Sequence, residues 1–219
     1  VIGSLTQSVA ASKTHADTIE SMHALRDWLT VHPDKAGDIA RSMMDAAMPD
    51  AVTSRIAHAL ELAGATSPES QQALAEILTA PAGTWPPGVV LQATAAAGGV
   101  GAHQSPELLA ALRQTAASQD PGEEFQTSDA ALFALGILSK DNPALRGELV
   151  TALSPRLETG GPFNAGDTEA ALYTLANARI ADPELTAKAQ SLAAGHADPA
   201  VRAAALEMLG LPGDHIESG

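Results

Sequence analysis

The chain repeats one phrase of amino acids after 40 residues, and this repetition limits the folds it can adopt more than any other feature. The first copy is Asp129-Ala-Ala-Leu-Phe-Ala-Leu-Gly136, followed by Asn142-Pro-Ala-Leu145. The second copy is Glu169-Ala-Ala-Leu-Tyr-Thr-Leu-Ala176, followed by Asp182-Pro-Glu-Leu185. Each copy predicts an apolar helix, a short turn and a second helix that opens with proline. A helical hairpin repeated at this period is typical of an α-solenoid, in which each hairpin buries its apolar side against the next.

Proline opens a predicted helix at regular intervals along the chain. In most cases Ser, Asn or Asp stands before the proline, where its side-chain oxygen can cap free amides of the first turn. The intervals are 35, 38, 37 and 40 residues between Pro33, Pro68, Pro106, Pro143 and Pro183. We therefore predict an all-α fold, a HEAT-sized right-handed α-α superhelix of about five helical pairs, with a terminal helix that opens at Pro199.

Apolar residues between these signals recur at helical spacing. Leu145, Leu149 and Leu153 step by four, which places them on one face of a helix. No stretch alternates as a strand would, so we predict no sheet. We expect helices over residues 16–31, 34–47, 50–64, 68–79, 87–99, 106–118, 128–139, 143–157, 167–179, 183–194 and 199–210. We expect residues 1–15 to form a short helix or a frayed end, 16–210 one continuous array, and 211–219 a tail.

Charge and cysteine content exclude several functions. The net charge is −14 and the twelve Lys and Arg residues are scattered, so a nucleic-acid partner is not expected. The absence of cysteine excludes disulfides, thiolate catalysis and sulfur-bound zinc. We find no apolar run long enough to span a membrane and no signal peptide, and the cellular compartment is left open.

The C-terminal phrase Asp198-Pro-Ala-Val-Arg-Ala-Ala-Ala-Leu-Glu-Met-Leu-Gly210 resembles the characteristic phrase of HEAT repeats. This resemblance implies an α-solenoid and, since most HEAT proteins are scaffolds or adaptors with a few enzymes among them, a binding function. Residues 172–178 and 197–206 are also similar to the helical domain of vitellogenin-type lipid-transfer proteins, which implies a lipid-associated helical module. The sequence predicts none of the β-sheets that form the lipid cavity of those proteins, so lipid is not the expected partner.

Histidines and glycines give no catalytic pattern. No two of the seven histidines lie four residues apart. The HEAT-type di-iron hydroxylases place His-Glu pairs where this chain has Asp129-Ala, Glu169-Ala and Arg202-Ala. The glycines of residues 98–101 follow no strand, so they predict a helix cap and a turn. We therefore expect no metal, no cofactor and no enzymatic activity. The alternative is a HEAT-type lyase or hydrolase, whose dispersed site would need a deep pocket with a His beside an acid.

Three long loops each hold one large aromatic residue: Trp85, Phe125 and Phe163. Acidic residues accompany them, among which we single out Glu123, Glu124 and Asp167. Loops at equivalent positions of a solenoid line up along one edge. These residues would then form an aromatic and partly acidic ridge that binds a basic or apolar segment. Alternatively, each ring packs down over its own repeat junction.

The combined expectation is a non-catalytic scaffold or adaptor module, part of a larger protein or complex. Its partner would be another protein or another domain of the same chain.

Overall fold

In a computed structural model, residues 2–44, 48–118 and 127–210 are described, and their regular elements are all helices. This part of the chain contains twelve α-helices, which confirms the all-α prediction. The chain divides into two compact units, Val1–Ser118 and Gln119–Gly219. The single array over residues 16–210 stays a prediction.

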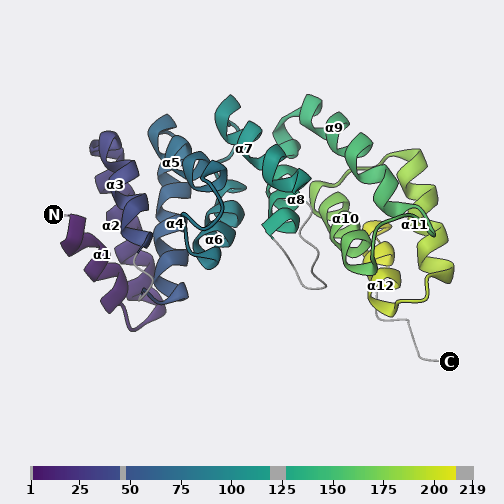
Figure 1. The fold of residues 1–219 in the computed structure, drawn as a ribbon, viewed down its shortest axis with the longest axis horizontal. Helices are drawn as coiled ribbons and strands as arrows, with labels where there is room; N and C mark the ends of the chain where they lie inside the picture. The colour runs from purple at the N-terminus through teal and green to yellow at the C-terminus, as the bar shows by residue number, and fades with distance from the viewer. Residues whose placement is uncertain (1, 45–47, 119–126, 211–219) are drawn as a thin grey trace. The chain divides into compact units, whose positions relative to one another are not determined.

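The first unit contains seven α-helices and two short 3-10 helices within its described residues. Their bounds are α1 (Ile2–Ala11), α2 (His15–Val31), η1 (Pro33–Lys35), α3 (Ala36–Arg41), η2 (Ser42–Met44), α4 (Asp50–Gly64), α5 (Pro68–Thr79), α6 (Pro87–Ala97) and α7 (Pro106–Ala117). Helix α4 packs against α2 and α6, while α5 packs against α3 and α7 (Figure 1). A helix that contacts the helices two before and two after it is consistent with a helical repeat.

The second unit follows the same packing rule. Its helices are α8 (Thr127–Leu138), η3 (Ser139–Asp141), α9 (Pro143–Leu153), η4 (Ser154–Leu157), α10 (Ala165–Ala178), α11 (Pro183–Gly195) and α12 (Pro199–Met208). Helix α10 packs against α8 and α12, and α12 also packs against α11. The leucines of α9 that were predicted to share a face, Leu145, Leu149 and Leu153, are all buried.

The residues before the helix-opening prolines cap their helices as predicted. Ser105 Oγ accepts a hydrogen bond from Leu108 N at 3.1 Å, and Asn142 Oδ1 accepts one from Leu145 N at 3.1 Å. Ser67, Asp182 and Asp198 do the same for α5, α11 and α12. His32 is the exception, because its side chain makes no capping hydrogen bond and the chain enters a 3-10 turn after it.

Two predicted helices differ in extent from the structure, and a third segment takes one of its two expected forms. The expected helix over 34–47 is divided into η1, α3 and η2, because its start lacks a side-chain cap and Gly37 is a weak helix former; residues 45–47 lie outside the described part. The expected helix over 143–157 ends at Leu153, since Pro155 has no N–H to donate to the preceding turn. Most of residues 1–15 form the short helix α1, the first of the two expected outcomes.

Candidate functional site

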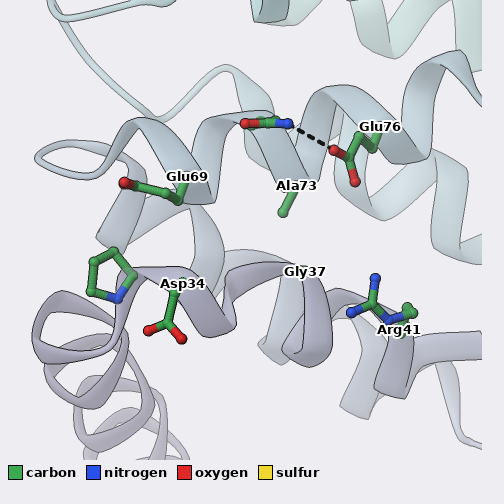
Figure 2. Close-up of a pocket in the computed structure, with 8 residues that line it drawn as sticks. Asp34, Gly37, Arg41, Glu69, Ala73 and Glu76 are labelled. Atoms are coloured by element: carbon green, nitrogen blue, oxygen red, sulfur yellow. Dashed lines mark hydrogen bonds between the residues drawn. The ribbon is translucent and has the colours of Figure 1, made fainter.

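A groove in the first unit lies between η1 and α3 on one side and α5 on the other (Figure 2). It encloses a cavity of about 240 Å³. The residues that line it are Pro33, Asp34, Gly37, Arg41, Glu69, Gln72, Ala73 and Glu76. Figure 2 shows Asp34 and Arg41 on the wall opposite Glu69 and Glu76.

Helical periodicity presents the α5 side chains to this groove. Glu69, Gln72, Ala73 and Glu76 follow one another at intervals of three, one and three residues, so they share a face of α5. Leu74 and Ile77 of α5 are buried on its other faces. Ala73 is itself buried and small, and Gly37 opposite has no side chain. Because Ala73 and Gly37 are small, a groove remains between the helices, and the polar side chains around them line it.

The groove has an excess of negative charge. Three carboxylates line it, against one guanidinium, that of Arg41. This guanidinium is ion-paired with Asp38 of the same helix, so its charge is already offset. Lys35 lies 3.2 Å from the carboxylate of Asp34 and 3.8 Å from that of Asp38.

Among the described residues, the two carboxylates of α5 have neutral hydrogen-bond partners: Glu69 accepts from Ser67 Oγ at 3.1 Å, and Glu76 from Gln72 Nε2 at 2.9 Å. They can therefore accept further bonds from Lys or Arg side chains.

A second cavity of about 390 Å³ lies between α1 and α2 in the same unit. It is lined by small side chains and two acids: Ser8, Ala11, Ser12, Asp17, Glu20, Ser21 and Ala24. The hydroxyl groups of Ser12 and Ser21 are 3.0 Å apart and bond to each other. This cavity therefore holds less charge than the groove at α5.

His58 and Glu61 of α4 form a side-chain pair, with the ring Nδ1 hydrogen-bonded to the carboxylate. Burial raises the pKa of Glu61, although the charge and the hydrogen bond of His58 act to lower it. The enzymatic alternative needs a His beside an acid within a deep pocket. Here the His and the acid are adjacent, but they line neither of the two cavities described above.

Ser154 and Lys188 of the second unit form another pair that resembles a catalytic dyad. Lys188 Nζ lies 2.6 Å from Ser154 Oγ and also bonds to Ser154 O at 3.2 Å. Desolvation lowers the pKa of Lys188, but bonds and charges from Glu184 and Glu158 outweigh it and raise the pKa. The two bonds from Lys188 to Ser154 link α11 to η4.

The predicted site residues within the described part have mainly local contacts. Trp85 is half-buried in the turn between α5 and α6. Phe163 is half-buried, with the guanidinium carbon of Arg156 5.3 Å from its ring centre, a cation–π contact. Asp167 N donates to Asn164 Oδ1 at 2.9 Å, and the Asp167 carboxylate accepts from Asn164 N at 3.1 Å, which makes a capping box for α10.

The other three predicted site residues, Phe125, Glu123 and Glu124, lie outside the described residues. The aromatic ridge therefore stays a prediction.

Sequence reasoning missed the acidic groove, although a signal for two of its residues was present. Asp34 and Glu69 each follow a helix-opening proline directly. They therefore take the same position in the second helices of two successive predicted helical pairs. Helices related in this way pack side by side in a repeat, as α3 and α5 do. Comparing the residue after each proline would have brought these two acids together.

Known proteins add no family assignment to this geometry. Among the described residues, no three His, Asp or Glu side chains are grouped to hold a metal ion. None of the described helices combines the length and the hydrophobicity needed to cross a bilayer. A comparison with models of protein families and with curated proteins finds no match to this chain.

Proposed function

We propose that this chain is a non-catalytic interaction module of the HEAT-like kind, a right-handed α-α superhelix of about five helical pairs plus a terminal helix. Its partner is another protein or another domain of the same chain. The packing of helices two apart, seen within each unit, supports this proposal. The proline-opened helices with side-chain caps support it as well.

The phrase that resembles HEAT repeats has a structural role at each of its characteristic positions. Asp198 caps α12 by accepting from Ala200 N at 2.8 Å, and Val201 is buried. Arg202 Nη1 donates to His196 O at 2.7 Å and to Ala197 O at 3.0 Å in the turn that precedes the helix. These contacts explain why an Asp-Pro turn followed by Val-Arg suits the start of a stacked helix, and they favour the HEAT-like assignment.

The acidic groove between α3 and α5 is the observation that carries the proposed binding function. Its charge complements a segment rich in Lys or Arg, and the same charge opposes a nucleic-acid phosphate backbone. We therefore propose that the module binds a basic segment of a partner protein, with Glu69 and Glu76 as acceptors. Lipid is not part of this proposal.

A binding measurement with a defined basic probe tests the assignment. The probe is a fluorescein-labelled peptide of about ten lysines, and the readout is fluorescence anisotropy across a salt series. We expect the full chain to bind it, and the double variant E69Q/E76Q to bind it about five- to tenfold more weakly.

The control removes the same charge elsewhere. E107Q/D141N takes two exposed acids from outside the groove, and we expect it to change affinity by less than about twofold. Equal losses in both double variants would show that the peptide responds only to net charge, and the groove would then not be the binding site.

A further inference from the structure

Gln71 on α5 is a buried polar side chain whose three hydrogen bonds hold the end of α4 and the turn between α6 and α7. It is 3% exposed. Its Nε2 donates to Gly64 O at 2.8 Å and to His103 O at 2.8 Å, while its Oε1 accepts from Ser105 N at 2.7 Å. Gly64 ends α4 within the same hairpin as Gln71, whereas His103 and Ser105 belong to the turn between α6 and α7. One amide group thus serves both the end of α4 and the turn before α7.

The bond from Ser105 N places Gln71 directly at the start of α7. Ser105 is the N-cap residue of α7, and its Oγ accepts from Leu108 N at 3.1 Å. Gln71 fixes the main chain of Ser105 and of His103 two residues before it. The geometry that lets Ser105 cap α7 therefore depends on a side chain of the preceding hairpin.

Apolar packing holds the same two turns together. Val100, in the turn after α6, is 1% exposed. A Cβ atom placed on Gly64 would lie 3.1 Å from Val100 Cγ1 and 3.3 Å from Gln71 Cγ. The bond from Gln71 to Gly64 O is buried, so its loss would leave a buried carbonyl without this partner.

We propose that Gln71 couples α7 and the turn before it to the hairpin α4–α5, so that they form one cooperative folding unit. Helix α7 packs against α5, and Gln71 adds its hydrogen bonds to this contact. In a stacked array, each hairpin has its own stability plus an interface free energy with its neighbour. Gln71 supplies two hydrogen bonds across this interface in addition to the packing of α7 against α5, so part of the interface free energy depends on it. Without Gln71, α7 opens by itself; with it, opening requires the hairpin α4–α5 to loosen as well.

Hydrogen exchange of the full chain, resolved by residue or by peptide, tests this coupling with a pair of neighbouring variants. Q71L keeps nearly the same side-chain size but forms no hydrogen bond. Q72L is the control, because Gln72 is exposed and bonds only to Glu76 on its own helix. We expect Q71L to speed exchange of the α7 amides by about tenfold or more relative to those of α4, and Q72L to leave this ratio unchanged.

Two results would overturn the proposal. One is an equal rise of exchange in α4 and α7 of Q71L, which would mean a loss of overall stability without uncoupling. The other is a rate of exchange in Q71L that matches the rate in Q72L.

Q71N is a milder second variant that keeps the amide but shortens its reach, and it decides the question where Q71L does not fold. We expect it to shift the same ratio by a smaller factor, and an unchanged ratio would refute the coupling.

Discussion

In each unit, a side chain at the same position of a proline-opened helix bonds to the main chain of a later segment, but the two side chains differ in chemistry. Gln71 is the fourth residue of α5 and Arg146 the fourth residue of α9, counted from the opening proline. Gln71 reaches His103 O, and Arg146 Nη2 donates to Ala178 O at 3.1 Å. The two residues of each bond are 32 apart in sequence in both units. The joining side chain therefore stands at the same position after the opening proline in both units.

Burial determines which side chain can stand there. Gln71 is almost fully buried, so a neutral amide that satisfies both its donor and its acceptor fits, whereas an unpaired charge would be costly. Arg146 is half-buried, and its guanidinium can keep contact with water while it donates one bond. The comparison teaches that a repeat can conserve a contact geometry and still change the residue that makes it.

A glycine allows close approach at both junctions, but with different tolerance. A Cβ on Gly136 of α8 would lie 2.9 Å from Thr174 Cγ2 and 3.3 Å from the backbone oxygen of Thr174. A Cβ on Gly64 would meet only side-chain atoms, the nearest at 3.1 Å. Side chains can shift more easily than helix backbone, so the second unit is the tighter of the two here.

Exchanging the two joining residues should have the largest effect. Q71R buries a guanidinium with no carboxylate partner and should lower the free energy of unfolding of the first unit by about 3–5 kcal/mol. R146Q should lower the free energy of unfolding of the second unit by about 1 kcal/mol or less, because the site is partly open to water. Urea unfolding measures both, with tryptophan fluorescence reporting on the first unit, where Trp28 and Trp85 lie, and circular dichroism on the whole chain. Equal losses of unfolding free energy in the two variants would mean that burial does not decide whether Gln or Arg occupies this position.

Alanine at the two glycines should have the next largest effect. G136A should destabilise the second unit by about 1–3 kcal/mol, because Thr174 and its backbone must move. G64A should be nearly neutral, since the strain on Val100 is offset by about 1 kcal/mol of improved helix propensity. Thermal unfolding of both variants checks this order, and a greater loss in G64A would reverse our ranking of the two junctions.

Removing the caps should affect both units alike. S105A and N142A each remove the side chain that accepts a hydrogen bond from the backbone N–H of the third helical residue. Each should lower the free energy of unfolding by about 1 kcal/mol. Chemical unfolding of the two variants provides the measurement. A clearly larger loss in S105A would show that the contact with Gln71 amplifies this cap.

The smallest effect concerns pH and the first unit only. Burial raises the pKa of Glu61 above its ordinary 4.5, with His58 opposing the shift, so the folded chain holds this proton more firmly than the unfolded chain. Its contribution to stability is present below the unfolded value and is lost as pH rises through the folded value. E61Q should therefore give a flatter profile of unfolding midpoint against pH between the unfolded and the folded pKa of Glu61. A profile parallel to that of the wild type would contradict this assignment.

Local signals in the sequence predicted most of the helices and their starts. The caps at Ser105 and Asn142 depend on residues within one turn, and the buried row of Leu145, Leu149 and Leu153 follows from spacing alone. The pair His58–Glu61 also has a local spacing of three residues, which a search for such pairs would have found. All these features depend on near neighbours in the chain, and a sequence displays near neighbours directly.

Tertiary structure alone decided what these helices bring together. Gln71 bonds to His103 and Lys188 bonds to Ser154, in both cases more than 30 residues apart. The periodic prolines place such residues at similar distances from the starts of their helices. They do not specify which side chains face each other. That depends on how closely two helices approach and on which polar groups are left without water, both of which are properties of the packed hairpins.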